Sequence, residues 1–394
     1  MPGGSGRTDT RDRRDPAEPI LESEAAREQE VRRRLSEAAR PAGWLRFDRF
    51  METALYASGV GFYTEPEAGF GPAGSFYTAA HVTPIFGRTV AQRIWAEYAR
   101  LERPATFTVV EVGCGDGTMS VDVVRSLAER LREGDSLRYV LVERSPALRA
   151  RALDRANPVA VGTGVELRAA EALSSDGPFE GVVLANELLD ALPVRRLVRR
   201  GPAWRELAVR ISDGPIEWQE EGIVKDPAAP PPGAAEEGGI VEVSPMVPGF
   251  FRELADHLTR GVALILDYGG EEAALVRDHP KGTLAAVRHH RPMPDPLAHP
   301  GLFDLSAFVN FTRARAAARS AGLQEQAFRP QAEALVSWGL ERLTEAAVQA
   351  SEGPEETVRT RLAVKNLLFG FSTFWALEVS PDAPTAPSAS VGRA

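Results

Sequence analysis

The sequence predicts an α/β protein with a doubly wound sheet, and three observations lead to this class. Short apolar runs of strand length alternate with segments whose apolar residues recur at helical spacing. A glycine-rich turn follows the first run, and polar side chains follow later runs, at the strand ends where open α/β sheets bind ligands. The expected strands are Phe107–Val112, Tyr139–Val142, Val165–Leu167, Gly181–Ala185 and Val262–Leu266.

The turn after the first strand is rich in glycine. Its alternating glycines are Gly113, Gly115 and Gly117, and a helix is expected next, over residues 119–132. Glycine is needed where φ is positive or where a ligand comes closer to the main chain than a Cβ allows. The spacing differs from the dinucleotide fingerprint G-x-G-x-x-G, because Thr118 stands at the third glycine position. A turn without a ligand is the alternative, although such glycines would weaken the chain without compensation.

The second strand is followed by Glu143. A carboxylate at the end of this strand can accept two hydrogen bonds from a ribose diol. Its distance from the glycines exceeds the usual spacing of about 20 residues, because the intervening helix is long. Ser145 and Pro146 fit the N-cap and first position of the next helix. The sequence therefore predicts that Glu143 contacts a ribose.

The fourth strand runs into the segment NELLDALP, residues 186–193. Asn186, Glu187 and Asp190 place three polar side chains at the carboxyl end of a buried strand, where open α/β sheets bind ligands. A plain helix start is the alternative, with Asn186 as N-cap and acids in the first turn.

The remaining segments are predicted to surround this sheet. Helical spacing over 44–64 indicates core packing, and another helix is expected over 89–101. Turns at 201–202 and 212–215 indicate β-hairpins beside the central sheet rather than within it. We also expect one surface helix over 20–39, a loop over 226–239, a helix from Ser244-Pro245 to near Gly261 and a closing edge strand over 371–379.

Composition narrows the class of partner and the compartment. The formal net charge of −9 argues against nucleic-acid binding through bulk electrostatics. Cys114 is the only cysteine, which excludes an internal disulfide or a cysteine-based metal site and fits a reducing compartment. No apolar run reaches the roughly 18 residues of a membrane span, and no apolar signal core is present near the N-terminus. We therefore expect a cytoplasmic protein without a membrane partner.

Several motifs together resemble known families. The pattern E-x-G-x-G-x-G from Glu111 to Gly117 resembles motif I of the class I S-adenosylmethionine (SAM) methyltransferases. From about residue 44 to 340, the chain resembles the mitochondrial complex I assembly-factor methyltransferases and their bacterial relatives. The matching pieces are Phe50-Met51, Gly61–Thr64, Gly74-x-Phe76-x-Thr78, Pro84-x-Phe86-Gly87, Asn186–Pro193, Trp204-x-Glu206, Gly301–Phe311 and Gln331 with Trp338–Leu340.

The resemblance implies a Rossmann-like sheet that binds SAM. In such proteins the glycine turn holds the methionine end of SAM, which would place Glu111 near its ammonium group. The residues expected to bind the cofactor are Glu111, Gly113, Gly115, Gly117, Glu143, Asn186 and Thr78. No metal is expected, because two adjacent histidines, His289 and His290, would point in different directions on a strand.

In the family the methyl acceptor is an arginine of a partner protein. A guanidinium stays protonated in water, with a pKa above roughly 12, so carboxylates that orient and polarise it would assist methylation. The candidate catalytic residues are Asp190, Glu187 and Glu206, and the candidate substrate-binding residues are Tyr268, His289 and Trp204. The chain departs from the family at Ser75, which replaces an acid, and at Phe308, which replaces a histidine.

These departures leave alternatives open. The acceptor could be a hydroxyl or an amine of a specialised metabolite, or the protein could be a SAM-binding scaffold without activity. The oligomeric state is also open, with a homodimer as one option. The expected organisation comprises tails at 1–19 and 380–394, a helical segment with a glycine-rich loop at 20–104, the first half of the SAM-binding core at 105–193, an inserted cap at 194–260 and the second half of the core at 261–379.

Overall fold

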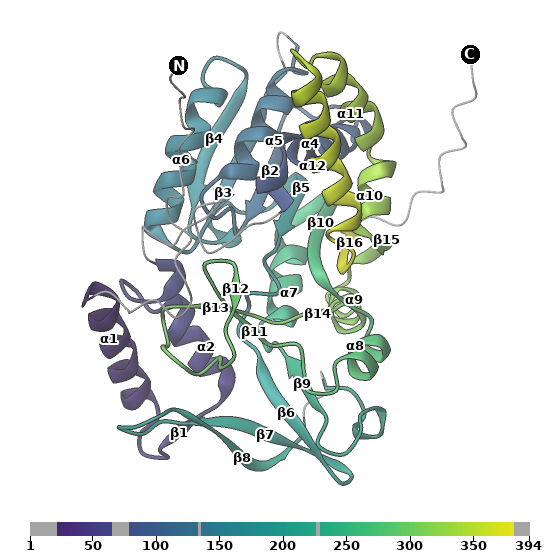
Figure 1. Ribbon diagram of the computed structural model, residues 1–394. Coiled ribbons are helices and arrows are strands. Elements are labelled where there is room, and N and C mark those ends of the chain that lie inside the picture. The colour runs from purple at the N-terminus through teal and green to yellow at the C-terminus, as the bar shows by residue number, and fades with distance from the viewer. Residues whose placement is uncertain (1–21, 65–78, 133–134, 226–228, 382–394) are drawn as a thin grey trace, which may run out of the picture.

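A computed structural model of the chain describes residues 22–64, 79–132, 135–225 and 229–381 (Figure 1). Its main sheet has the strand order β15-β16-β10-β5-β2-β3-β4. The parallel strands are β2 (Phe107–Val112), β3 (Leu137–Val142), β4 (Val165–Ala170), β5 (Phe179–Asn186) and β10 (Leu258–Gly270). Each expected strand is present, and the α/β class is confirmed.

One side of the sheet ends in antiparallel strands. β16 (Phe374–Ser380) pairs with β10, and β15 (Gln324–Pro330) pairs with the other side of β16. The prediction of a strand over 371–379 is confirmed, but its position at the edge is wrong. β15 takes that position because its residues bond to the free side of β16. The short strand β14 (Val309–Asn310) pairs with the carboxyl end of β10.

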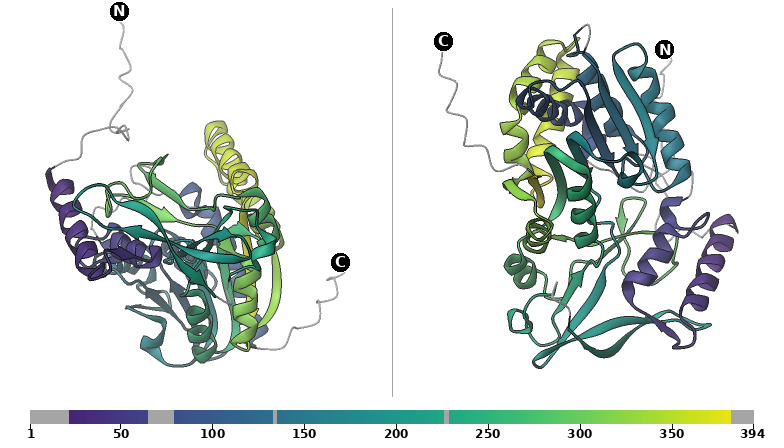
Figure 2. Two further views of the ribbon diagram at one scale, coloured as in Figure 1. Left: turned by 90° about the horizontal axis from the view of Figure 1, so that it is seen from below. Right: turned by 180° about the vertical axis from the view of Figure 1, so that it is seen from behind.

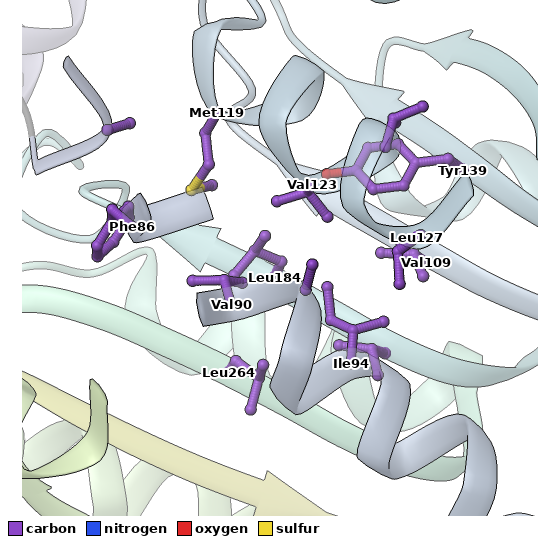
Figure 3. Packing of buried hydrophobic residues seen from close by; sticks show 14 of the residues in the cluster. Phe86, Val90, Ile94, Val109, Met119, Val123, Leu127, Tyr139, Leu184 and Leu264 are labelled. Carbon is purple, nitrogen blue, oxygen red and sulfur yellow. The ribbon is translucent and has the colours of Figure 1, made fainter. Parts of the chain in front are cut away.

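Alternate residues of the central strands face opposite layers of helices, as the period of two in a strand requires. Val109, Leu184 and Leu264 are buried against the first layer. In Figure 3 their side chains lie close to those of Val90 and Val123, which come from two of the covering helices. The helices of this layer are α3 (Ala79–Val82), α4 (Pro84–Arg100), α5 (Thr118–Ala128), α6 (Pro146–Ala160), α10 (Gln331–Ser337), α11 (Leu340–Gln349) and α12 (Pro354–Phe369).

The second face of the sheet packs against a smaller layer. Val110, Val183 and Ile265 meet Phe251 of α7 (Val247–His257) and Phe311 of α9 (Phe311–Ser320). Because both faces are covered there, the central strands β2, β5 and β10 bury apolar residues on both sides, and polar groups collect at their carboxyl ends. The short helix α8 (Glu272–Asp278) and the 3₁₀ turns η2 (Leu173–Asp176) and η3 (Pro232–Ala234) lie in the connections.

A second layer of structure faces the carboxyl edge of the main sheet (Figures 1 and 2). It contains two small sheets with the orders β1-β7-β6-β9, to which β8 adds, and β12-β11-β13. We call these two small sheets, together with the N-terminal helices, the inserted layer. Its elements are α1 (Glu22–Ala38), β1 (Trp44–Leu45), α2 (Phe47–Tyr56), η1 (Phe62–Thr64), β6 (Arg195–Arg200), β7 (Ala203–Arg210), β8 (Glu217–Val224), β9 (Ile240–Val243), β11 (Ala285–Arg288), β12 (Arg291–Pro292) and β13 (Asp304–Ser306).

The inserted layer has a hydrophobic core of its own. Phe47 and Phe50 of α2 stack with each other, and Trp218 of β8 and Leu305 of β13 pack into the same cluster. Burying apolar area in this way is worth about 25 cal/mol per Å². The predicted core packing of 44–64 and the hairpins beside the sheet are confirmed. The predicted surface helix is α1, and Val31 lies on its fully buried side.

The helix expected between Ser244-Pro245 and Gly261 is shorter than predicted. It runs from Val247 to His257 as α7, and Gly261 belongs to β10. A Cβ at Gly261 would lie 1.8 Å from the carbonyl oxygen of Gly181 in the neighbouring strand β5. This glycine therefore marks the close approach of two strands rather than the end of a helix.

Candidate active site

The carboxyl ends of β2, β3, β5 and β10 meet at one edge of the main sheet. A cavity of about 840 Å³ is lined by residues of this edge and by residues of the inserted layer. The strand order reverses between β2 and β5, and open α/β sheets bind ligands at such a point. From the main sheet come Gly113, Gly115, Glu143, Glu187, Asp190 and Tyr268, and from the inserted layer come Tyr56, Tyr63 and Asp304.

The glycine turn forms one end of this cavity. Gly113, Gly115 and Gly117 all have positive φ angles, of 73°, 56° and 79°, which explains their identity. A Cβ at Gly117 would lie 2.7 Å from the Cα atom of Ala152, so this glycine also lets α5 approach α6. Gly113 and Gly115 line the cavity directly, so a ligand there meets main chain rather than side chains.

Glu143 lies beside the glycine turn and lines the same cavity. Its carboxyl accepts hydrogen bonds from the main-chain nitrogen of Gly115 at 3.1 Å and from that of Ser145 at 2.8 Å. Burial raises the pKa of this carboxyl, and these N–H donors oppose the rise. Glu143 thus fixes the shape of the turn from the strand end at which the sequence places a ribose ligand. Ser145 also caps α6, as expected.

Glu111 lies behind the turn and is almost fully buried. Its Oε2 atom accepts hydrogen bonds from the hydroxyls of Ser120 and Tyr139, both at 2.6 Å. Burial raises the pKa of Glu111 to about 7, although these donors lower it. Glu111 also lines a small cavity of about 70 Å³ together with Gly115 and Asn186.

Asn186 is the last residue of β5, and Glu187 follows it. No helix begins there, which removes the alternative that this segment is a plain helix start. The Oδ1 atom of Asn186 is buried without a hydrogen-bond partner among the described residues. Glu187 has a φ of 50°, a conformation that non-glycine residues rarely adopt and that is common at functional sites. Its Oε1 atom accepts a hydrogen bond from the main-chain nitrogen of Ala79.

Asp267 holds the segment that carries Glu187 and Asp190. It is fully buried at the end of β10, and its Oδ2 atom accepts hydrogen bonds from the main-chain nitrogens of Leu188, Leu189 and Asp190, at 3.1, 2.8 and 3.3 Å. The sequence alone assigned no role to Asp267. The structure gives Asp267 a positioning role, because these bonds hold the main chain of the turn and leave the carboxyls of Glu187 and Asp190 facing the cavity.

The acids that face the cavity are buried and lack cationic partners. Among the described residues, no arginine, lysine or histidine forms an ion pair with Glu187, Asp190 or Asp304. Burial raises the pKa of Glu187 to about 8, of Asp190 to about 6 and of Asp304 to about 8. Repulsion from Asp190 adds to the rise for Glu187 and Asp304. Such carboxyls are stabilised in their charged form by a cationic ligand.

Phenols accompany these acids. Hydrogen bonding to the hydroxyl of Tyr268 favours the charged form of Asp190 and lowers its pKa. The hydroxyl of Tyr63 donates to Asp304 Oδ1 at 2.8 Å, and that of Tyr56 donates to the carbonyl of Ala191 at 2.8 Å. Tyr268 was predicted to contact substrate, and it lines the cavity.

Three of the six predicted catalytic and substrate-binding residues are not among the described residues that line the cavity. The prediction that Glu206 is catalytic needs correction. Its carboxylate is bound by Arg195 within the hairpin sheet, with one N–O distance of 3.1 Å. Trp204 is buried in the same sheet and donates its ring N–H to the carbonyl of Pro230. His289 lies in a turn after β11, and the neighbouring His290 lines the cavity instead.

Two further expectations concern the residues at which the chain departs from the family. Thr78, expected to bind the cofactor, and Ser75 lie outside the described residues. Phe308 packs edge-on against Tyr268, with ring centroids 5.3 Å apart, and lines a separate cavity of about 320 Å³. Phe308 therefore supports the wall that Tyr268 forms rather than forming the wall itself.

The cavity has the groups that SAM requires. Gly113 and Gly115 expose main chain without a Cβ, and Glu143 lies at the end of the second strand. In the small cavity of about 70 Å³ on the other side of Gly113 and Gly115, the unpartnered Oδ1 atom of Asn186 can accept a hydrogen bond from the ammonium of the methionine end. These residues therefore fit SAM as the cofactor.

Comparison with known proteins agrees with this geometry. A family model described as "putative S-adenosyl-L-methionine-dependent methyltransferase" matches residues 89–329. The chain belongs to this family. The membership confirms the predicted methyltransferase class and SAM as the methyl donor.

Individual relatives extend this match. A mitochondrial protein arginine methyltransferase NDUFAF7 homolog from Drosophila melanogaster is 28% identical over 69% of this chain and 66% of its own length. The Bos taurus protein arginine methyltransferase NDUFAF7 is 29% identical over 68% of this chain and 64% of its own length. The chain thus spans about two-thirds of the length of these relatives.

A solved structure covers nearly the whole chain. It is a COG1565 superfamily member and likely methyl transferase from Burkholderia thailandensis, bound to S-adenosyl-homocysteine. It is 27% identical with a TM-score of 0.80, and the match covers 93% of this chain and 96% of that one.

Among the described residues, no helix is both long and apolar enough to cross a membrane.

The sequence reasoning missed Tyr56, Tyr63 and Asp304 as members of the site. Tyr63 and Asp304 stand in segments that were recognised as matching the family, namely 61–64 and 301–311. A motif match shows that a segment matters but does not show which of its side chains faces a cavity. That information comes only from the packing of η1 and β13 over the edge of the main sheet.

Proposed function

We propose that this protein transfers a methyl group from SAM to a nitrogen of a protein arginine side chain. The observation that carries the proposal is that the glycine turn and the buried, unpaired acids Glu187 and Asp190 line one cavity. The names of the fly and cow relatives support arginine as the acceptor. The proposed cofactor contacts are Gly113, Gly115, Glu143 and Asn186, with Glu111 and Gly117 shaping the turn from behind.

The reaction replaces one proton on the acceptor nitrogen by a methyl group. When bound, SAM supplies a methyl group on a positively charged sulfur, which leaves with the electron pair of the broken carbon–sulfur bond. The protein must therefore hold the guanidinium in line and accept the released proton. A guanidinium rarely loses a proton in water, because its pKa exceeds about 12. A neighbouring carboxylate is the group that can orient it and take the proton.

Asp190 and Glu187 divide these tasks in the proposal. Asp190, with a pKa of about 6, is largely ionised at neutral pH and is assigned the orienting and proton-accepting role. Glu187, with a pKa of about 8, ionises when a cation enters and contributes a second acceptor for guanidinium N–H groups. Tyr268 forms the wall beside Asp190 and Asp267 keeps both acids in place.

The decisive test is to identify the methylated product. The protein is incubated with SAM carrying a labelled methyl group and with a protein extract, and the protein fraction is then hydrolysed to amino acids. We expect label in methylarginine, and its loss in the Asp190→Asn variant. Label that appears only in small molecules would support a metabolite as the acceptor and contradict the proposal.

The scaffold alternative predicts a different pattern. A scaffold would bind SAM without transferring label to any fraction. Measuring SAM affinity by calorimetry on the same preparation separates this case from a protein that has lost its fold, since a misfolded preparation would show neither binding nor transfer.

A further inference from the structure

The acceptor end of the cavity contains two carboxyl–phenol pairs that come from different layers. Asp190 and Tyr268 belong to the main sheet edge. Asp304 lies on β13, and Tyr63 belongs to η1 of the N-terminal segment, so the second pair comes from the inserted layer. The two layers thus contribute one acid each to the same space, in addition to Glu187.

Asp304 has few partners for a buried acid. It is 7% exposed, and its side chain accepts a hydrogen bond from the Tyr63 hydroxyl at 2.8 Å. No cationic residue among those described pairs with it. Asp190 is also 7% exposed, and its buried Oδ1 atom accepts no hydrogen bond from the described residues. Each of these acids therefore has a phenol as hydrogen-bond partner, but neither has, in the described part of the chain, the opposite charge that a buried carboxylate normally pairs with.

Aromatic rings flank the second pair. The rings of Tyr56 and Tyr63 stack with centroids 5.4 Å apart and an interplanar angle of 29°. The guanidinium of Arg144, which also lines the cavity, lies over the Tyr56 ring at 4.8 Å. Flat aromatic faces favour planar cations, and a guanidinium presents N–H groups along two edges that separate carboxylates can accept.

We propose that Asp304, held by Tyr63, is a specificity-determining residue that binds the acceptor guanidinium. It does so from the inserted layer, whereas Asp190 binds the guanidinium from the edge of the main sheet. This inference rests on the proposed function and extends it. Two acids on separate layers select a planar cation with donors on both edges over a compact ammonium, which satisfies one acid at a time.

A structural role is the alternative, in which the Tyr63–Asp304 bond only ties η1 to β13. Two variants separate the cases. Asp304→Asn keeps an oxygen that accepts from Tyr63 but removes the charge, whereas Tyr63→Phe removes the tie but keeps the acid. A structural tie predicts that Tyr63→Phe lowers the melting temperature and that Asp304→Asn changes little. Acceptor binding predicts the larger loss of ligand affinity for Asp304→Asn.

The experiment measures binding of three matched probes to the protein saturated with S-adenosyl-homocysteine. They are the Nα-acetyl methylamides of arginine, lysine and citrulline, which differ in having a guanidinium, an ammonium or a neutral urea. We expect wild type to prefer the arginine probe and Asp304→Asn to bind it about 10- to 100-fold more weakly, the usual effect of losing hydrogen bonds to a charged group. The melting temperature should stay close to that of wild type.

Controls distinguish failure of this inference from failure of the proposed function. Asp213→Asn, in an exposed turn, should bind all probes as wild type does. If Asp190→Asn loses arginine binding but Asp304→Asn does not, Asp304 is not part of the acceptor site while the proposed function stands. If wild type prefers lysine or citrulline, the arginine acceptor is wrong, and an effect of Asp304→Asn on the preferred probe still places Asp304 in the site. Failure of wild type to bind any probe contradicts the inference.

Discussion

Main-chain atoms form one end of the cavity, whereas side chains from distant segments form the other. At the end proposed to bind SAM, which we call the cofactor end, Gly113 and Gly115 lie within one turn, and Glu143 fixes that turn through the Gly115 nitrogen. At the acceptor end, Asp190 and Asp304 are more than 100 positions apart in the chain and belong to different layers. A local turn can bind a cofactor shared by many enzymes, while assembled side chains can distinguish one acceptor from another.

The two ends also differ in their electrostatics. Glu143 accepts hydrogen bonds from main-chain donors, so its contact with the turn is satisfied before any ligand binds. Asp190 and Asp304 have no cationic partner among the described residues, and burial raises the pKa of each. In the proposed function, the cofactor end is thus preorganised, and the acceptor end would be completed by the charge of its ligand. The following variants test this contrast, from the largest expected effect to the smallest.

Gly115→Val should abolish SAM binding while leaving the protein folded. The branched side chain would occupy space at the cofactor end, where Gly115 lines the cavity. Because Gly115 has a φ of 56°, the variant also introduces backbone strain. Gly201→Val is the matched control, since Gly201 has a φ of 57° in a hairpin turn with no atom near its Cβ position. Calorimetry on both folded variants checks this, and near-normal SAM affinity for Gly115→Val would refute the assignment of the turn.

Asp190→Asn and Glu187→Gln should spare SAM affinity and lower turnover. The replacements keep shape but remove the charge that orients the acceptor and accepts its proton, a loss of about 10²–10⁴-fold. Methyl transfer, SAM affinity and melting temperature are measured on the same preparations, with Asp213→Asn as control. Unchanged turnover with a lower melting temperature would show that these acids stabilise the turn and that the acceptor binds elsewhere.

Glu143→Ala should weaken SAM binding by about 1.5–3 kcal/mol, the usual value of a hydrogen bond to a charged group. Part of this loss would come from the glycine turn, because the Gly115 nitrogen loses its partner. Glu143→Gln keeps an acceptor for that nitrogen and separates the two contributions. If neither variant changes the dissociation constant of SAM, another residue binds the ribose.

The pH dependence of activity should follow the ionisation of the acids at the acceptor end. Asp190 must be ionised to accept the proton and Glu187 to accept hydrogen bonds from the guanidinium, and their pKa values in the free protein are about 6 and 8. The value of kcat/KM should therefore rise with pH between about 6 and 8 and then level off. Bound cations favour the charged carboxyls, so the corresponding rise in kcat should occur at lower pH. A profile that Glu187→Gln and Asp190→Asn leave unchanged would contradict these roles.

Glu206→Gln should have the smallest effect on turnover. Its carboxylate is paired with Arg195 in the hairpin sheet and does not line the cavity among the described residues. Removing one partner of a buried pair typically costs about 3–5 kcal/mol of stability, so a lower melting temperature is expected with unchanged turnover per folded molecule. A selective loss of turnover would return Glu206 to the catalytic set.

The sequence by itself determined the main sheet and the glycine turn. Strands such as Phe107–Val112 are buried on both faces, so most of their residues are apolar and they can be recognised without a structure. The glycine turn is equally local, because the positive φ angles of Gly113, Gly115 and Gly117 depend on adjacent residues. Local interactions within a few residues leave a readable pattern in the chain.

Only the tertiary structure decided the acceptor end. The sequence could propose Asp190 from its strand end, but it also proposed Glu206, whose pairing with Arg195 depends on the register of two strands. It could not place Asp304 beside Tyr63, because 241 positions separate them and their contact follows from the packing of the inserted layer over the main sheet. Periodicity and motif spacing record which face of an element is buried, whereas the partner across a cavity is set by how separate elements pack together.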